Sequence, residues 1–299
     1  MIPGGKDGAV ASRGVIWLAV GEAFVAEAAV SAASMRRHLR LPSTIFTDRP
    51  RAARATGCFD DVVEIVPSGP RPHRDKLLAM RDSPYEETLF LDTDTFVGAP
   101  LDDAWELLGR FDLAAAIDRG YVDRFPAGTG VPDVFKEPNL GVVFFRRSPA
   151  MTAMLDEATA IYDRFAAPGP GFASAFDQPP LRVALYRSDL RFAPLQDEDN
   201  CRFANYGKLN GPVRVLHGRL RRAPFDEATL SRLLARMNAT TVPRVFVAGR
   251  VLALWPRRLK ASHEYRARRM PAANLVDPRL LAATFARRLR ALFGGRTAG

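Results

Sequence analysis

Between residues 14 and 223, short apolar runs alternate with stretches in which apolar residues recur every three or four positions. Short runs rich in β-branched and aromatic residues predict β-strands, and the wider spacing predicts helices. The predicted strands are residues 15–20, 43–47, 62–66, 88–91, 113–117, 141–145 and 213–216. Strands that alternate with helices favour an α/β fold, in which a mostly parallel sheet is flanked by helices.

Polar residues and glycine follow these apolar runs where the predicted strands end. They are Gly21, Asp48, Asp92, Asp94, Asp118 and His217. In open α/β sheets the ligand binds beyond the carboxyl ends of the strands. We therefore expect several of these residues to meet at one site, although they are far apart in the sequence.

The pair Asp92 and Asp94 is the strongest chemical signal. Both follow the apolar run 88–91 and are separated by one threonine. Two such carboxylates can share a hard divalent cation that keeps positions open for phosphate oxygens. Such a cation assists the departure of a diphosphate, whose oxygens gain charge as its bond breaks. The alternative is a solvated turn at the end of a strand.

His217 is a second signal, because it ends the predicted strand 213–216 and precedes a glycine. A histidine in this position suits a third metal ligand, and an imidazole favours Mn²⁺ over Mg²⁺. The alternative is a histidine held by hydrogen bonds for structural reasons.

Six ordered segments together resemble a known superfamily. They are the first strand up to Gly21, Lys76, FLDTD (90–94), NLGVVF (139–144), FDQ (176–178) and LHG (216–218). In this order and at these spacings, residues 14–220 resemble the GT-A glycosyltransferases, and family 8 (glycogenin and galactosyltransferase types) more than other branches. The resemblance implies a Rossmann-like GT-A fold and transfer of a sugar from a nucleotide-diphosphate donor, with a UDP-sugar expected, to a glycan, lipid or other hydroxyl acceptor.

The resemblance also implies where the donor binds. Asp92, Asp94 and His217 would hold Mn²⁺ or Mg²⁺ and, through it, the diphosphate. Lys76 would contact the donor sugar or a phosphate, although it is also compatible with a surface charge. The residues that would line the nucleotide pocket are Val20, Gly21 and Asp48.

Four further positions are implied near the sugar. Asn139 would touch the donor sugar or the acceptor, and Gly141 would let the backbone approach closely. Asp177 and Gln178 would lie on the reacting face of the sugar as the catalytic pair. Two simpler interpretations stay open: Asn139 caps a turn, or Asp177 is the N-cap of a helix.

The chain departs from the family pattern in two places. After the first strand the family often has Asp or Asn with a Tyr, whereas GEAF (21–24) stands here, so Phe24 or another ring would stack on the base. After the histidine the family often has Gly-x-x-Lys-Pro-Trp, whereas this chain has GRLRR (218–222). These arginines carry charge that suits a diphosphate.

Family 8 resemblance implies retention of the anomeric configuration, which requires no protein base for the acceptor. Asp177 or Gln178 would then stabilise an oxocarbenium-like transition state. An inverting enzyme instead needs a carboxylate base at the acceptor hydroxyl. The acidic run 197–199 offers one, and a solvated loop is the alternative.

The net charge of +10 is concentrated near the C-terminal end. From Arg244 onward there are 13 Lys or Arg residues and 2 Asp or Glu residues. This segment favours an anionic partner such as an acidic membrane surface or a polyanionic acceptor, or else it is a solvated arginine-rich surface. We expect no nucleic-acid partner. Residues 278–293 predict a basic amphipathic helix that either lies on a membrane or packs against the body.

These patterns divide the chain into a disordered segment 1–13, a GT-A domain 14–223 and a basic extension 224–299 made of a helix, a hairpin and the amphipathic helix. Only Cys58 and Cys201 are present, which favours reduced thiols. No apolar run reaches transmembrane length and no secretory signal is evident. We expect a cytoplasmic protein, with peripheral contact at the inner membrane face left open.

Two other functions are compatible with parts of the sequence. Haloacid-dehalogenase-type phosphatases also place Asp-x-Asp after a strand, but they favour Thr or Val at the position of Phe96 and have the motif nearer the N-terminus. A catalytically inactive protein that binds nucleotide sugars or glycans is the second alternative. The retained Asp92, Asp94 and His217 argue against it.

Overall fold

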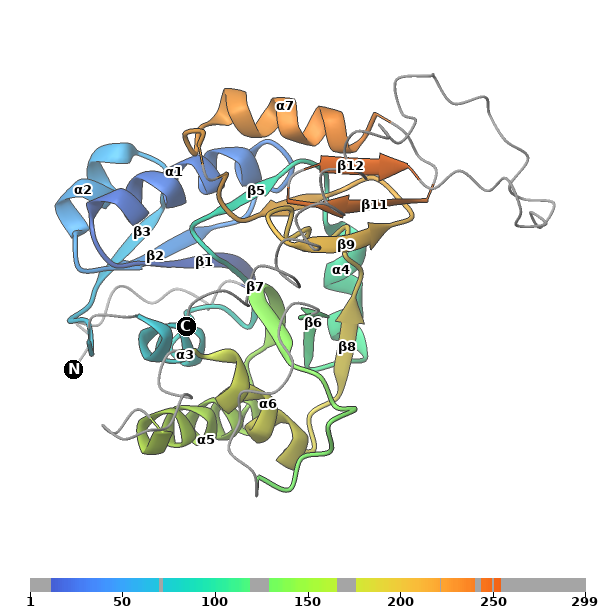
Figure 1. The fold of residues 1–299 in the computed structure, drawn as a ribbon. Coiled ribbons are helices and arrows are strands. Elements are labelled where there is room, and N and C mark those ends of the chain that lie inside the picture. Colours follow the sequence, from blue (N-terminus) through green and yellow to red (C-terminus); the bar gives the residue numbers. More distant parts are fainter. Residues whose placement is uncertain are drawn as a thin grey trace, which may run out of the picture.

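The computed structural model describes residues 12–69, 72–118, 129–165, 176–220, 222–239, 243–248 and 250–253 (Figure 1). The strands are β1 (Arg13–Ala19), β2 (Ser43–Thr47), β3 (Asp61–Glu64), β4 (Glu87–Leu91), β5 (Thr95–Val97), β6 (Leu113–Ile117), β7 (Pro138–Arg146), β8 (Phe192–Leu195), β9 (Tyr206–Leu209), β10 (Val215–His217), β11 (Arg244–Val247) and β12 (Arg250–Ala253). The helices are α1 (Glu22–Arg36), α2 (Pro50–Thr56), α3 (His73–Arg81), α4 (Asp102–Glu106), α5 (Pro149–Phe165), α6 (Gln178–Arg187) and α7 (Glu227–Met237), with a 3-10 turn at Leu107–Gly109.

Seven strands form the central sheet in the order β3-β2-β1-β4-β7-β6-β8. β3, β2, β1 and β4 are parallel to one another, and β8 is parallel to β6. β7 is antiparallel to both of its neighbours, β4 and β6. The predicted α/β fold with a mostly parallel sheet is therefore confirmed. Because β7 is reversed, its first residues lie at the same edge of the sheet as the carboxyl end of β4, where the acidic pair begins.

Both faces of the sheet are covered, which explains why β1 is apolar without a break. Trp17 packs with α1 residues such as Met35 on one face, whereas Ile16 packs with residues of α3 and α5 on the other. Successive side chains of a strand point to opposite faces, so one strand supplies both cores. Figure 1 shows α1 and α2 on one side of the sheet and α3, α5 and α6 on the other.

A third apolar core joins the C-terminal elements to the central body. β5 pairs with β10, and β9, β11 and β12 form a separate antiparallel sheet. Phe96, Phe203, Leu233 and Phe246 are buried together in this core with other residues of α7. The α7 helix begins at an N-cap, where Asp226 accepts a hydrogen bond of 2.7 Å from the Thr229 amide.

Several boundaries differ from the sequence expectations. β1 begins at Arg13, within the segment expected to be disordered, because Arg13 and Gly14 pair with β4. β3 ends at Glu64, two residues before the predicted run does. The predicted amphipathic helix 278–293 lies outside the described residues. Among the helices that are described, none is both long and apolar enough to cross a membrane.

Candidate active site

A tight turn after β4 presents the acidic pair. β4 ends at Leu91, and the Asp92 amide donates a 2.9 Å hydrogen bond to the Gly141 carbonyl of β7. The Thr95 hydroxyl then donates to the Asp92 carbonyl at 2.8 Å and closes the turn. β5 starts immediately, and its residue Thr95 is paired with His217 of β10. This pairing carries the histidine to the acidic pair across 125 residues of sequence.

The three expected metal ligands converge. The Nε2 atom of His217 lies 3.5 Å from an oxygen of Asp92 and 3.5 Å from an oxygen of Asp94. One ligand atom from each residue lies within 4.8 Å of the other two. The opposite ring nitrogen, Nδ1, is 2.8 Å from the side-chain oxygen of Asn200. That contact assigns the proton to Nδ1 and leaves Nε2 available as a metal ligand, so these residues fit a divalent cation.

Two glycines make this geometry accessible. A Cβ atom at position 141 would lie 2.0 Å from Cε1 of His217, so no larger residue fits beside the ring. Gly218 has a φ of +121°, a backbone conformation that other residues rarely adopt, and its amide donates to the Asp94 carbonyl at 2.9 Å. The LHG segment is thereby fixed to the acidic turn.

A buried lysine joins the metal centre to the expected catalytic pair. The ammonium group of Lys76 lies 2.6 Å from Asp92 and 3.1 Å from Asp177. His73 adds a contact of 3.4 Å to the other oxygen of Asp177. Asp177 occupies the N-cap position of α6 but makes no side-chain capping bond. Its carboxylate faces the lysine instead, which excludes the interpretation as a simple helix cap.

An arginine covers the other side of the acidic pair. Arg219 donates to Asp94 at 2.9 Å and to Glu27 of α1 at 2.7 Å. Its guanidinium lies 5.4 Å from the centre of the Phe24 ring. The sequence indicated charge in the GRLRR segment but gave no sign of Glu27, because a glutamate on the exposed side of a predicted helix is commonplace.

The charges of the site shift the pKa values of its members. Burial lowers the pKa of His217, but Asp94 and Asp92 outweigh burial and raise it to about 9. Burial raises the pKa of Asp94, but His217 and Arg219 outweigh it and hold the pKa below the usual value. For Lys76, burial is likewise outweighed by Asp177 and Asp92, which raise its pKa. The site therefore contains ionised carboxylates and cations in close contact at neutral pH.

A hydrogen-bonded chain of amides runs from the histidine to Gln178. Asn200 donates to the Asn139 side chain at 2.8 Å, and Asn139 donates to Gln178 at 2.9 Å. Gln178 in turn donates to Asp118 at 2.8 Å. Asp118 stands at the end of a predicted strand, whereas nothing in the sequence around Asn200 marked it, because it lies in a loop without periodicity.

Gly21 and Asp48, two of the residues expected to line a nucleotide pocket, lie together beyond the ends of β1 and β2. Gly21 has a φ of +94°, and its amide donates to Asp48 at 2.7 Å. Val20 is half-buried next to them, and the Phe24 ring is 42 % exposed at the start of α1. An exposed ring beside a backbone turn and a carboxylate is suited to stacking on a base.

The three carboxylates in the acidic run 197–199 bind other parts of the chain. Glu198 accepts hydrogen bonds from the amides of Asn210 and Gly211, the latter at 2.8 Å. Asp199 pairs with Arg214. These two carboxylates hold loops together and are not placed to act as an acceptor base, while Asp197 accepts from the Lys208 amide at 3.1 Å and lines a hollow beside the amide chain.

The sheet order, the reversed β7 and the position of the acidic turn define the GT-A glycosyltransferase fold. The galactosyltransferase LgtC, solved with donor and acceptor sugar analogues, superimposes with a TM-score of 0.50 at 15% identity, over 76% of this chain and 96% of that one. An active-site mutant of LgtC gives the same TM-score at 16% identity, over 74% and 94% of the two chains. At these identities the likeness establishes the fold alone.

A further solved structure has a higher sequence identity but a lower TM-score. The glycosyltransferase GlyE of Streptococcus pneumoniae TIGR4 matches at 20% identity with a TM-score of 0.47, over 65% of this chain. The chain spans about half of GlyE, 47% of its length. No family model and no curated protein matches the sequence. The fold is thus the one expected from the sequence, and assignment to family 8 stays a prediction.

Proposed function

We propose that the protein is a metal-dependent glycosyltransferase that transfers a sugar from a nucleotide-diphosphate donor, a UDP-sugar, to a hydroxyl acceptor with retention. The observation that carries this proposal is the convergence of Asp92, Asp94 and His217 at the edge of a GT-A sheet. Solved proteins with this fold, such as the galactosyltransferase LgtC, support sugar transfer. No observation at the site favours the phosphatase alternative.

The donor would lie across the carboxyl edge of the sheet. Its base would stack near Phe24, with the ribose toward Asp48 and the diphosphate at the acidic pair. A bound Mn²⁺ or Mg²⁺ would supply positive charge that stabilises the departing diphosphate. Arg219 already reaches Asp94 and would add a second positive charge at the same place.

The transfer step requires no protein base. The oxygen of the acceptor hydroxyl forms the new bond to the anomeric carbon, and the bond from that carbon to the diphosphate oxygen breaks. The bonding electrons and the acceptor proton leave on the diphosphate. Asp177 would face the developing positive charge of the sugar, held in place by Lys76 and His73. Gln178, fixed by Asn139 and Asp118, would be its partner on the reacting face.

Donor hydrolysis tests this proposal without a known acceptor, because water can take the acceptor's place. Purified protein with Mn²⁺ is incubated with a panel of UDP- and GDP-sugars, and the release of nucleoside diphosphate is measured. We expect nucleoside diphosphate to be released from one donor class. In Asp94→Asn the rate of this release should fall about a hundredfold or more. Asp163→Asn is the matched control, since Asp163 pairs with Arg74 on the surface.

Three outcomes would count against the proposal. Release that persists in chelator and in Asp94→Asn would reject metal dependence. Binding of a nucleotide sugar without turnover would identify an inactive binding protein. Inverted product from an identified acceptor would reject retention, because the acceptor would then have attacked the face of the sugar opposite to the departing diphosphate.

A further inference from the structure

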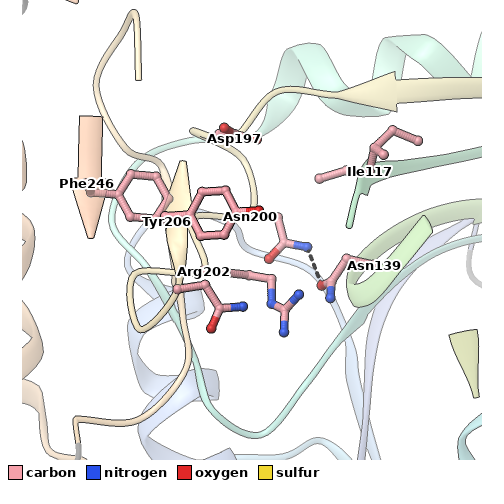
Figure 2. Close-up of a pocket in the computed structure, with 9 residues that line it drawn as sticks. Ile117, Asn139, Asp197, Asn200, Arg202, Tyr206 and Phe246 are labelled. Carbon is pink, nitrogen blue, oxygen red and sulfur yellow. Dashed lines mark hydrogen bonds between the residues drawn. The ribbon is translucent and has the colours of Figure 1, made fainter. Parts of the chain in front are cut away.

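A hollow open to solvent lies beside the amide chain. Residues from β6, β7, β9, β11 and the loop after β8 line it. Figure 2 shows the side chains that surround it, with the Asn200–Asn139 hydrogen bond at one side and the rings of Tyr206 and Phe246 at the other. Of the positions singled out in the sequence, Asn139 and Asp197 of the acidic run belong to this hollow.

The hollow shares residues with the candidate active site. Asn139 and Asn200 line it, and the same two residues connect His217 to Gln178. Arg202 also lines it and pairs with Asp118, the residue that accepts the hydrogen bond from Gln178. A molecule in the hollow would therefore contact the side chains that hold Gln178 at the candidate active site.

The lining combines polar side chains with apolar ones, and Tyr206 adds an accessible aromatic ring. Asp197, Arg202 and Asn205 bring acceptors and donors of hydrogen bonds, and Asn139 and Asn200 add amides. Tyr206 is 58 % exposed. Convergent polar groups that form hydrogen bonds to hydroxyls, next to one flat ring, suit a sugar.

The hairpin β11–β12 fixes the position of the Tyr206 ring. β11 pairs with β9, and Tyr206 lies opposite Val247 while Gly207 lies opposite Phe246. A Cβ atom at position 207 would lie 2.5 Å from the Phe246 ring, which is 2 % exposed and serves as the back wall. The hairpin thus contributes directly to the shape of the hollow, through Phe246 and through its hold on β9.

We propose that this hollow is the acceptor subsite and that it binds a sugar ring of a carbohydrate acceptor. Tyr206 supplies the surface on which the ring stacks, and Asp197 and Arg202 bind its hydroxyls. This inference rests on the proposed glycosyltransferase function, since it names the acceptor of that reaction. It assigns the hairpin at residues 244–253 to acceptor recognition and not to donor binding.

The first test compares transfer with hydrolysis in the full chain. The donor identified by the hydrolysis assay is supplied with p-nitrophenyl glycosides or with octanol as acceptors. In Tyr206→Ala we expect the ratio of transfer to hydrolysis to fall about tenfold for glycosides, the effect of losing one aromatic contact. Tyr206→Phe should retain most of the ratio because the ring is kept. Tyr186→Ala, at an exposed tyrosine of α6 outside the hollow, is the matched control.

A second measurement needs no donor and no turnover. Saturation-transfer NMR detects methyl glycosides bound to the wild-type protein and to Tyr206→Ala, after melting curves have confirmed that both are folded. Loss of the signal in Tyr206→Ala supports the subsite, and an equal signal overturns it. Transfer to octanol but to no glycoside would overturn it as well. A wild-type protein that binds glycosides but hydrolyses no nucleotide sugar would reject the proposed function and leave the subsite supported.

Discussion

Gly141 and His217 belong to different sheets, and their contact leaves no space for a side chain at position 141. An alanine there would displace the imidazole from the acidic pair. We expect Gly141→Ala to weaken Mn²⁺ binding by about 10- to 100-fold, the range seen when groups that orient metal ligands are altered. Isothermal titration with Mn²⁺ measures the effect. Gly109→Ala is the control, because a Cβ atom there would meet nothing within 4 Å; equal affinities for the two variants would contradict the geometry.

The protonation of His217 leads to a second prediction at this scale. Because its pKa is raised to about 9, the imidazole is protonated at neutral pH in the metal-free protein. A metal binds only the neutral ring, so a proton must leave first. Apparent Mn²⁺ affinity should therefore rise with pH between about 7 and 9 and level off above the pKa. Titrations at several pH values test this; in His217→Gln the slope should disappear, and a slope that survives would assign it to another group.

At the scale of elements, the hairpin β11–β12 and helix α7 belong to one packed unit with β9 and β10. Phe246 is buried in the same core as Phe96 and Phe203, which come from the central body. Arg244 is fully buried and donates to the carbonyls of Met237 and Gly211. The segment after residue 224 is thus tied to the body by apolar contacts and by buried hydrogen bonds.

This packing predicts a large stability effect from the hairpin. Phe246→Ala removes a buried ring and should lower the free energy of unfolding by about 3–5 kcal/mol. Val247→Ala is the matched control, because the neighbouring side chain is 48 % exposed and its removal should change stability by about 0.5 kcal/mol or less. Urea denaturation of the full chain measures both. If the two variants unfold alike, the hairpin does not share the core.

The sequence predicted the elements that have strong periodicity and missed those that depend on long-range contacts. Residues 43–47 and 113–117 are strands within the predicted bounds, because 113–117 is a continuous apolar run and 43–47 is rich in β-branched and aromatic residues. The reversal of β7 was not predictable, since an apolar run reads the same in either direction. β8 and β9 have four residues each and are partly exposed, so they give no clear alternation.

The residues of the candidate site were predictable where they follow apolar runs and not where they depend on long-range contacts. Asp92, Asp94 and His217 follow apolar runs, and the resemblance placed them together. Glu27 and Asn200 acquire their roles only through folding: one reaches Arg219 and the other His217, 192 and 17 residues away in the sequence. Contacts of this kind leave no local pattern.

At the scale of the whole molecule, the two substrates would meet at one edge of the sheet, where the acidic turn lies between the nucleotide pocket and the hollow. Metal and diphosphate would occupy adjoining positions there, so each should strengthen the binding of the other. The linkage between binding and stability makes this coupling measurable in the intact protein.

We expect Mn²⁺ and UDP together to raise the melting temperature by more than the sum of their separate effects. A chelator should remove the excess. In Asp94→Asn the excess should be lost while the separate effect of UDP is partly kept, because Phe24 and Asp48 remain. Differential scanning fluorimetry with ADP and GDP as comparison ligands identifies the base. Additive shifts in the wild-type protein would place the two ligands at unrelated sites.

The pairing of β9 with β11 has a consequence for how such a protein can diversify. The turn proposed to receive the nucleotide lies within the first fifty residues, whereas the wall behind Tyr206 is formed by residues after 243. Substitutions in the late segment would then change which acceptor is used, while the nucleotide-sugar donor stays the same. Proteins descended from one ancestral chain would then transfer the same donor sugar to different acceptors.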